Sequence, residues 1–575
     1  GRVLAQVLTL VSSCPPFFQT GSVCSVAMSV VLSVDIGTSS VRCTAYLRSD
    51  SLSLEEECHS LSIVAAGDEK TPGQPDASGR FHTYILLTAT NKAVTKCLEA
   101  LRRKGTYRIA AMGFDCFAMS LIGTDENGHA ATPCYSYAER GPTTGLYARK
   151  MREILRRRGD LAGAYQRTGT PVHAAYAAPT LLRLRHEEPD MLQHVRCWQT
   201  FTSFLLSVWT GKLRVPVSYS EASWTGLLNR RTFNWDEGML RAVGMKPSML
   251  APVCDYDGIM SLRLSPEFAR KWPELSCAHF LLGFGDGAMA NVGSKCVDTS
   301  RIAATIGTSA ALRIVVPSDK VPQIPCGLWC YSIDREHSLL GGALTDGGSV
   351  YEWIADVVGS KYATSMETHL SQAPMPGAHG LTVLPFLSGE RSPGWNDAAA
   401  GAICGITRHT TGQHIARAML EAVALRIAAV ARLLVPHAKT DVQVLASGTA
   451  LTASPVWKQM IADALGRQLL VEAVPQATSR GVAVMACRAL RARAGGTSGS
   501  AAKLPLVAEP LSEGVASIEP CAERTAAFAT ALLSQQRVYN IMFGQSWLAP
   551  KSDRLQVTLV AVAVLAGAAA AAALG

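Results

Sequence analysis

The sequence predicts an α/β protein built from two related domains. At 575 residues the chain is longer than a single hydrophobic core normally supports, so more than one domain is expected. The tetrapeptide Ile-Gly-Thr-Ser occurs at residues 36–39 and again at 306–309. The identity alone proves nothing in a chain of this length. Each copy, however, lies between two β-prone runs, one in each half of the chain, and this context favours two domains that contribute the same kind of turn.

The first copy belongs to a predicted β-hairpin over residues 31–46, with its turn at 37–40. Gly37 lets the backbone turn where a Cβ atom would clash, so successive N–H groups and three hydroxyls can point into one concavity that suits an oxyanion. Asp35 precedes the turn, and a carboxylate beside a phosphate makes physical sense only with a divalent cation, Mg²⁺, between them. The alternative is an ordinary hairpin with a polar tip.

The second copy predicts another hairpin, over residues 301–315, with Gly307, Thr308 and Ser309 in its turn. Thr305 replaces the acid of the first copy, so only the first hairpin is expected to organise a cation. Two such turns facing each other would hold the phosphates of one nucleotide between the domains.

Composition limits the functional class. Hydrophobic residues make up 48% of the chain and charged residues 17%, as in a globular protein, and a net charge of +9 is too mild at this length to indicate nucleic-acid binding. The basic tracts at 102–104 and 156–158 lack interleaved aromatic residues, which is typical of solvated helix faces. None of the 16 cysteines forms a Cys-x-x-Cys pair, so we expect buried thiols in a reducing compartment.

In the first half, residues 1–27 precede the first methionine and are interpreted as a processed leader, a fragment or an extension. Glycine, proline and aspartate predict a loop over 65–81, and a helix is expected over 83–104. Residues 108–114 predict a short buried strand. The loop that follows, 115–120, would open at the carboxyl end of this strand, where ligands usually bind in α/β sheets.

The second half begins with the glycine-rich segment 283–291, where we place the domain junction. Another glycine-rich stretch, 341–348, runs into a predicted helix at 349–358 whose amino end could face a ligand; an ordinary turn is an equally good interpretation. Residues 413–435 predict a strongly apolar helix.

Towards the end of the chain, a predicted strand at 441–446 leads through a small-residue turn at 447–449 into a helix near Pro455, a third candidate contact for the nucleotide. Residues 495–502 are small and polar and predict a loose insertion. Residues 557–574 are almost entirely apolar but fall short of the ~20 residues that span a bilayer. They are interpreted as either a tail anchor or an unstructured extension.

Five motifs occur in an order that is typical of one protein family. They are Asp35-Ile-Gly-Thr-Ser-Ser40, Gly283-Phe-Gly-Asp-Gly287, Thr305-Ile-Gly-Thr-Ser309, Gly389-Glu-Arg-Ser-Pro-Gly-Trp395, and the segment 447–463 with Trp457, Ala462 and Asp463. Through them residues 31–545 resemble the FGGY family of carbohydrate kinases. The pattern over 117–121, His173 and the segment 389–395 is most similar to gluconate-kinase-like members. The resemblance implies a two-domain actin-like ATPase fold, of the ribonuclease H-like type, with an interdomain nucleotide and sugar cleft.

The resemblance also divides the chain. Residues 1–27 form a leader or extension, 28–298 an N-terminal domain with the substrate site and the first phosphate turn, 299–545 a C-terminal domain for the nucleotide, and 546–575 a tail with an apolar stretch. Closure of the two domains over ATP and a small carbohydrate would exclude water and suppress ATP hydrolysis.

The resemblance implies roles for individual residues. Asp286 would be the catalytic base and contact the substrate hydroxyl, and the helix expected to start near Gly287 would favour its ionised form. Its alternative role is to cap that helix. Asp35 would hold Mg²⁺. The nucleotide contacts would be Gly37, Thr38, Ser39, Gly307, Thr308, Ser309, Gly448 and Thr449. Further substrate contacts would be Asp76, Phe117, Ser120 and Arg140.

Four positions depart from the family pattern. Met119 stands where many members have His, Glu139 where Asp is usual, and Thr180 near a frequent Lys or Arg. These three leave the substrate open. Thr449 stands where a second glycine is usual, and its β-branched side chain is expected to weaken ATP binding.

The leading hypothesis is an ATP-dependent kinase that phosphorylates a hydroxyl of a small sugar, polyol or sugar acid, with gluconate the best single candidate and a pentulose such as xylulose or ribulose next. The alternative is a catalytically weakened nucleotide-binding regulator of the same fold, against which the presence of Asp286 argues. A chaperone-like ATPase is disfavoured because the segment after residue 545 is too short for a peptide-binding domain. We expect a cytoplasmic protein without a nucleic-acid partner, and consider organelle import, tail anchoring and a homodimer.

Overall fold

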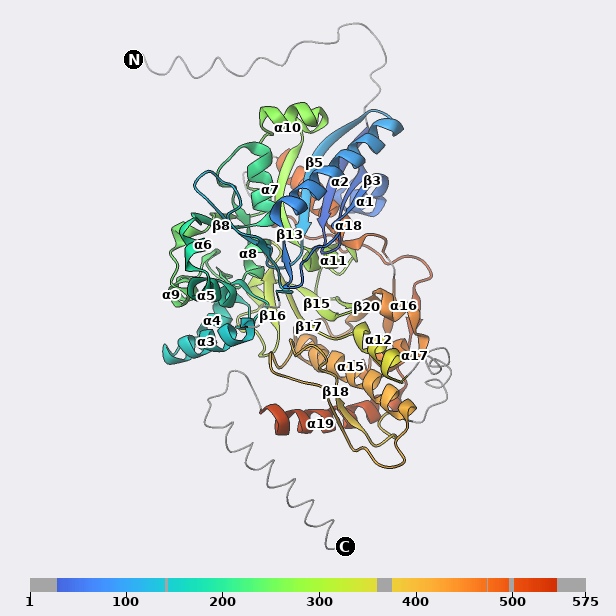
Figure 1. Ribbon diagram of the computed structural model, residues 1–575. Coiled ribbons are helices and arrows are strands. Elements are labelled where there is room, and N and C mark those ends of the chain that lie inside the picture. Colours follow the sequence, from blue (N-terminus) through green and yellow to red (C-terminus); the bar gives the residue numbers. More distant parts are fainter. Residues whose placement is uncertain (1–27, 140–142, 359–374, 473, 496–500, 545–575) are drawn as a thin grey trace, which may run out of the picture.

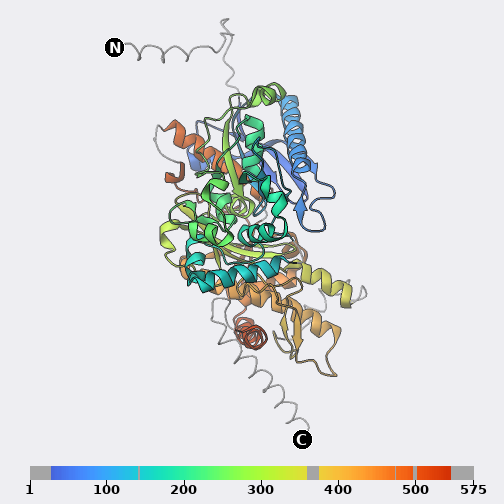
Figure 2. The same cartoon turned by 60° about the vertical axis from the view of Figure 1, so that its left-hand side comes forward.

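The computed structural model describes residues 28–139, 143–358, 375–472, 474–495 and 501–544. The expectations for residues 1–27, for Arg140 and for residues 546–575 lie outside these ranges. Figure 1 and Figure 2 show two lobes, with most of the first half of the chain in the upper lobe and most of the second half below it. Among the described residues, no helix has both the length and the apolar character needed to cross a bilayer.

The first lobe is organised by a five-stranded sheet of order β13-β5-β1-β2-β3. Its strands are β1 (Met28–Ile36), β2 (Ser40–Arg48), β3 (Ser62–Lys70), β5 (Tyr107–Cys116) and β13 (His279–Gly285). Strands β1, β2 and β3 are antiparallel neighbours, whereas β1, β5 and β13 run parallel to one another.

The second lobe repeats this arrangement in a seven-stranded sheet of order β16-β17-β15-β14-β20-β21-β22. Its strands are β14 (Arg301–Ile306), β15 (Ala310–Pro317), β16 (Trp329–Ser332), β17 (His337–Leu344), β20 (Gln443–Ser447), β21 (Leu469–Val471) and β22 (Ala516–Ile518). Here β14, β15 and β17 are antiparallel neighbours, and β14, β20 and β21 run parallel. The repeated tetrapeptide begins at the last residue of β1 and of β14, so the predicted two-domain α/β fold is confirmed.

Helices pack on these sheets and on one another. They are α2 (Thr83–Lys104), α11 (Asp286–Gly293), α12 (Gly348–Val358), α15 (Gly412–Leu434), α17 (Pro455–Leu465), α18 (Ala477–Ala494) and α19 (Ala522–Phe543). Helix α2 packs on β2 and β3, and α15 packs on β15 and β17. Helix α15 begins where Thr411 and His414 form a capping box. The predicted helices at 83–104 and 413–435 are confirmed to within one residue at each end.

Helix α18 belongs to the second half of the chain but packs against β1, β5 and α11 of the first lobe. Figure 1 shows it in orange among the blue elements. The backbones of α11 and α18 meet at two glycines: a Cβ on Gly293 would lie 1.7 Å from the carbonyl oxygen of Ala477, and one on Gly481 would lie 2.1 Å from that of Met289. This close packing against α18 holds α11, the helix that begins at Asp286, in position.

The chain between β5 and β13 contributes most of a third unit, with a small sheet of order β4-β7-β6-β8. Its strands are β4 (Arg80–Phe81), β6 (Leu121–Thr124), β7 (Cys134–Tyr135) and β8 (Cys197–Thr200), and its helices are α3 (Thr144–Arg157), α4 (Leu161–Thr168), α5 (Ala177–Glu187), α6 (Pro189–Gln193), α7 (Phe201–Thr210), α8 (Tyr219–Trp224) and α9 (Glu237–Val243). The remaining short elements are α1 (Leu54–Ser60), α10 (Pro266–Lys271), α16 (Thr449–Ala453), β9 (Val217–Ser218), β10 (Leu228–Asn229), β11 (Asn234–Trp235), β12 (Val253–Cys254), β18 (Thr382–Leu384) and β19 (Ala402–Cys404).

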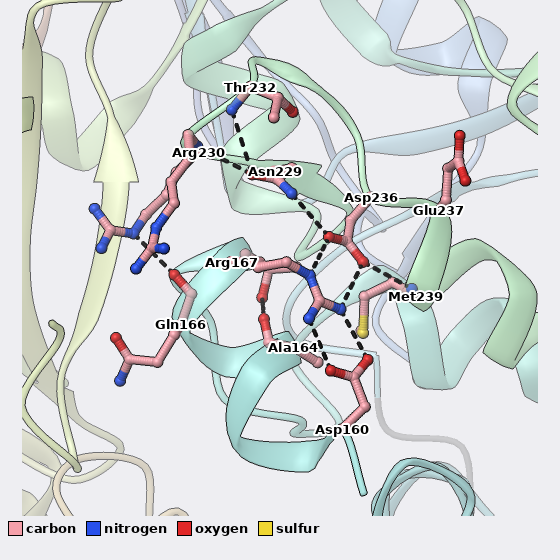
Figure 3. Close-up of polar contacts among 12 residues, drawn as sticks. Asp160, Ala164, Gln166, Arg167, Asn229, Arg230, Thr232, Asp236, Glu237 and Met239 are labelled. Atoms are coloured by element: carbon pink, nitrogen blue, oxygen red, sulfur yellow. Dashed lines mark hydrogen bonds and ion pairs between the residues drawn. The ribbon is translucent and has the colours of Figure 1, made fainter. Parts of the chain in front are cut away.

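An arginine binds two parts of this unit together. The guanidinium of Arg167 on α4 lies between two carboxylates: Nη1 donates to Asp160 and Nε donates to Asp236, each at 2.7 Å (Figure 3). Arg230, drawn in the same view, donates through Nη2 to the carbonyl oxygen of Val321 at 2.7 Å. Because Val321 lies in the second half of the chain, this bond helps to seat the unit against the second lobe.

Two boundaries predicted from the sequence are wrong. The loop expected over 65–81 begins inside β3, which pairs with β2 despite its glycine, alanine and charged residues. Gly67 allows this strand to approach α2, since a Cβ there would lie 2.5 Å from the carbonyl oxygen of Ala93. Asp115, expected in the loop after a strand, is instead the penultimate residue of β5 and pairs with Asp35.

Candidate active site

A cavity of about 180 Å³ lies between the two lobes. Asp286 at the end of β13, together with Ser309 and Arg313 of the second hairpin, forms part of its lining. Six aromatic side chains also line it: Tyr137, Tyr176, Trp224, Trp329, Tyr331 and Trp395. The ring of Tyr331 is stacked between those of Trp329 and Trp224, with centroid distances of 4.2 and 4.7 Å. Aromatic faces beside charged groups suit a small polar molecule that also has C–H surface.

Asp286 is the first residue of α11, and its Oδ1 accepts a hydrogen bond from the N–H of Gly287 at 2.6 Å. Burial raises the pKa of Asp286 to about 6, against the opposing effects of Arg313 and the Gly287 N–H. The start of the helix was expected to favour the ionised form, but burial outweighs it. A carboxyl with this pKa can accept a proton at neutral pH.

Two arginines line the cavity that sequence reasoning did not assign to the site. Arg313 lies on β15 near Asp286, and its Nη1 is 3.4 Å from Oγ1 of Thr305. Arg391 lies within the segment 389–395, and its Nε–H has no hydrogen-bond partner among the described residues. The only sequence signal that Arg313 belongs to a functional site is that it is the one charged side chain in an otherwise apolar strand. Arg391 lies in a recognised motif, but the motif alone assigns it no function.

Asp35 and Asp115 are register neighbours on the parallel strands β1 and β5. Burial raises the pKa of Asp115 well above its usual range, and the charges of Asp35 and Asp286 raise it further. Burial also raises the pKa of Asp35, although Asp115 and Arg42 oppose this rise. The structure therefore brings Asp35, the predicted metal ligand, and Asp286, the predicted base, together with the carboxyl of Asp115.

The predicted nucleotide contacts of the second half gather at one corner of the second sheet. The turn at 307–309 follows β14, and the N–H of Gly348 at the start of α12 donates to the carbonyl of Gly307 at 2.7 Å. Gly448 follows the neighbouring strand β20 with φ of +108°, and a Cβ there would lie 2.3 Å from a carbonyl oxygen of β14. Thr449, which is exposed, begins α16 beside it. The first turn, with Gly37, Thr38 and Ser39, joins β1 to β2 in the other lobe.

Unlike Asp286, the other predicted substrate contacts in the described part of the chain do not line the cavity. Asp76 accepts hydrogen bonds from the N–H groups of two later residues at 2.9 Å and is not among the residues that line the cavity. Phe117 stacks on a neighbouring phenylalanine with centroids 4.5 Å apart, and Ser120 is buried with φ of +38°. These two flank Ala118, which does line the cavity. Arg140 lies outside the described residues.

The departures from the family pattern at Glu139 and Thr180 belong to one buried network. Glu139 accepts a hydrogen bond from Arg183 at 2.6 Å, is 3.0 Å from Nη2 of Arg80, and accepts another from Thr180 at 3.3 Å. Met119 is buried with φ of +71°. None of the three substituted positions is among the residues that line the cavity.

Comparison with known proteins decides the family. The sequence profile of the FGGY family of carbohydrate kinases, N-terminal domain, matches residues 30–293, and that of its C-terminal domain matches residues 302–490. The chain belongs to the FGGY family of carbohydrate kinases. This FGGY protein is therefore an enzyme, a kinase of a sugar or polyol, and the family takes the transferred phosphate from ATP.

Individual FGGY relatives differ in substrate. The chain is 26% identical over 467 residues to a gluconokinase of Bacillus subtilis, which covers 80% of this chain and 87% of the relative. It is 27% identical over 400 residues to a glycerol kinase of Thermus brockianus, which covers 67% and 77%. A gluconate kinase and a ligand-bound xylulose kinase of Lactobacillus acidophilus each superimpose with a TM-score of 0.75 over 90% of this chain and 98% of theirs, at 22% and 23% identity. These structures confirm the fold.

Proposed function

We propose that this FGGY kinase phosphorylates a linear sugar acid, with gluconate as the best single candidate and a pentulose such as xylulose or ribulose next. The observation that carries the proposal is the pair Arg313 and Arg391 in the cavity that also contains Asp286. Guanidinium groups bind carboxylates through paired N–H donors. A neutral polyol would leave the unpartnered Nε–H of Arg391 without an acceptor of opposite charge.

In this proposal the chain's own residues position the substrate and move one proton. Asp286 accepts the proton of the attacking hydroxyl as the new O–P bond forms. Arg313, next to Asp286, helps to keep that carboxylate ionised, and it lines the same cavity as Ser309 of the second turn, where its charge favours that of the phosphoryl group. The aromatic wall contacts the C–H surface of the sugar chain and excludes water.

The proposal also includes MgATP. The turns at 37–39 and 307–309 bind its β- and γ-phosphates, Gly448 approaches the adenosine, and Asp35 holds Mg²⁺, whose charge offsets that of the phosphates. Asp35 fits this ion because it is a carboxylate in a buried cluster of acids. No three His, Cys, Asp or Glu side chains in the described part of the chain could share one metal, and Mg²⁺ commonly takes one or two carboxylates and keeps several waters. A cytoplasmic location and a homodimer stay predictions.

The test compares kcat/KM for gluconate, xylulose, ribulose and glycerol, by coupled ADP release, in the wild type, Arg391→Gln and Arg140→Ala. We expect the wild type to prefer gluconate and Arg391→Gln to lower that value by about 30-fold, or ~2 kcal/mol, with little effect on the neutral substrates. Arg140→Ala is the control, because it removes the arginine that sequence reasoning favoured. If kcat/KM for gluconate falls only in Arg140→Ala, then Arg140 rather than Arg391 binds the substrate carboxylate. A wild type that is inactive on gluconate would refute the proposal.

A further inference from the structure

A pair of buried carboxyls lies at one edge of the first sheet. Asp35 on β1 and Asp115 on β5 are neighbours in register, and the Cα atoms of such neighbours are about 4.8 Å apart. Asp115 is fully buried, and its hydrogen-bond partner is the carboxyl of Asp35; no other donor of the described residues reaches either of its oxygens. The charged groups that face it are the other carboxyls of Asp35, Asp286 and Glu221. Two buried carboxyls that have only each other as partners are costly, so their presence needs an explanation.

The second sheet provides an internal comparison. In the second sheet, Thr305 on β14 corresponds to Asp35. Its register neighbour on the parallel strand β20 is Ser447, which corresponds to Asp115. There the two hydroxyls meet, with Oγ of Ser447 donating to Oγ1 of Thr305 at 3.4 Å. Small uncharged side chains thus satisfy the same two positions of the same fold. The carboxyl pair of the first sheet is not a requirement of the architecture.

We propose that Asp115 is a second carboxylate of the divalent-cation site that Asp35 begins, so that nucleotide-bound Mg²⁺ is held from both β1 and β5. The inference rests on the proposed function, which puts the phosphates of MgATP at the turn after β1. Two carboxylates, water and phosphate oxygens can complete the octahedral set that Mg²⁺ prefers. Without the ion, the two carboxyls share a hydrogen bond in which one of them holds a proton, and the charge of the ion would allow both to be ionised.

Removal of the Asp115 charge should act in opposite directions on metal-free and metal-bound nucleotide. Without a cation, Asp115 gives the nucleotide no attractive contact, and any ionised fraction of it repels phosphate, so Asp115→Asn should bind AMP-PNP at least as tightly as the wild type does. With Mg²⁺, the variant lacks one ligand, and its affinity for AMP-PNP should fall about tenfold or more. Without Mg²⁺, the variant should unfold at the same or a higher temperature, because an amide can keep the hydrogen bond to Asp35 without burying a second ionisable carboxyl.

Isothermal titration calorimetry of the full chain with AMP-PNP, in Mg²⁺ or in EDTA, measures these effects. The variants are Asp115→Asn and Asp115→Ser, the second of which copies the residue found in the second sheet. The matched control is Glu221→Gln, which removes another buried carboxyl of the same cluster. Because Oε2 of Glu221 already accepts a hydrogen bond from Thr200 at 2.7 Å, this control should leave the effect of Mg²⁺ on AMP-PNP affinity unchanged.

The proposal is overturned if Mg²⁺ tightens AMP-PNP binding equally in the wild type and in both Asp115 variants, or if it has no effect in the wild type. Lower unfolding temperatures together with an unchanged Mg²⁺ effect would assign Asp115 a structural role and would overturn it as well. Failure of the proposed function is a separate result, since a wild type that phosphorylates no sugar acid can still bind AMP-PNP in a Mg²⁺-dependent way.

Discussion

The Nε2 atom of His173 lies 2.7 Å from Oδ1 of Asp397, and this contact joins the first lobe to the second beside the cavity. Nδ1 of His173 accepts a hydrogen bond from the N–H of Ala175 at 3.2 Å, so Nε2 carries the proton that points to the carboxylate. Arg152 donates to the other oxygen of Asp397 at 3.2 Å. Trp395, which lines the cavity, packs against the His173 ring with centroids 5.3 Å apart. The pair therefore holds one wall of the cavity.

We predict that Asp397→Asn destabilises this junction. Burial alone would raise the pKa of Asp397, but His173 and Arg152 lower it to about 2 from an unperturbed 3.8. A carboxylate with a depressed folded-state pKa contributes stability above its unfolded pKa, and the contribution is lost as the pH falls towards 2. Urea unfolding at pH 7 should show a loss of about 2 kcal/mol, roughly halved near pH 3. An unchanged free energy of unfolding at pH 7 would contradict the role of this pair.

For Asp286→Asn we expect kcat to fall by at least ~100-fold while the affinity for AMP-PNP stays the same, because the change removes a proton acceptor and little binding contact. The same variant should be more stable at neutral pH. Burial raises the folded-state pKa of Asp286, so the stability that the protonated carboxyl contributes at low pH is lost as the pH rises through about 6. Turnover comparable to the wild type would disprove the assignment of Asp286 as the base.

The pH dependence of the wild type offers an independent check. A general base must be ionised to act, and the pKa of Asp286 is raised to about 6 by burial. We therefore expect kcat/KM to be level near neutrality and to decline about tenfold per pH unit well below pH 6. A coupled assay in buffers of constant ionic strength measures this profile. A flat profile across that range would mean that another group receives the proton.

The substitution Thr449→Gly should tighten ATP binding. The exposed side chain of Thr449 begins α16, immediately after Gly448, whose backbone approaches β14 too closely for a Cβ. Removing a β-branched side chain there would let a nucleotide come closer to the backbone. Calorimetric titration with ATP in the absence of sugar is the measurement. Weaker or equal binding would show that the loop accommodates threonine in a way that does not restrict the nucleotide.

Much of the fold could be predicted because its signals are local. The hairpins at 31–46 and 301–315 combine β-prone runs with a small polar turn, and the helix at 83–104 has a continuous pattern. Strand β3 could not be predicted, since glycine, alanine and charged residues have low strand propensity and only pairing with β2 and packing against α2 keep them extended.

The candidate site was harder to predict than the fold. Asp286 could be identified because it lies in a recognisable glycine-rich motif. Arg313, Arg391 and Asp115 gain their importance from neighbours that are distant along the chain and belong to different strands or lobes. A lone charge in an apolar strand marks Arg313 and a motif contains Arg391, but neither signal shows which distant residues they meet, and only the packing of the chain brings these residues together.

Helix α18 affects the order in which the protein can mature. The ribosome releases residues 477–494 only after every strand of the first sheet has been made, yet α18 covers β1 and β5. Arg480 and Arg491 on this helix donate to the carbonyl oxygens of Cys58 and Ser49, at 2.9 and 3.0 Å. When synthesis has reached residue 298, the face of the first sheet that α18 covers is therefore still exposed. The lobe that is synthesised first is completed only after residues 477–494 of the second half have emerged.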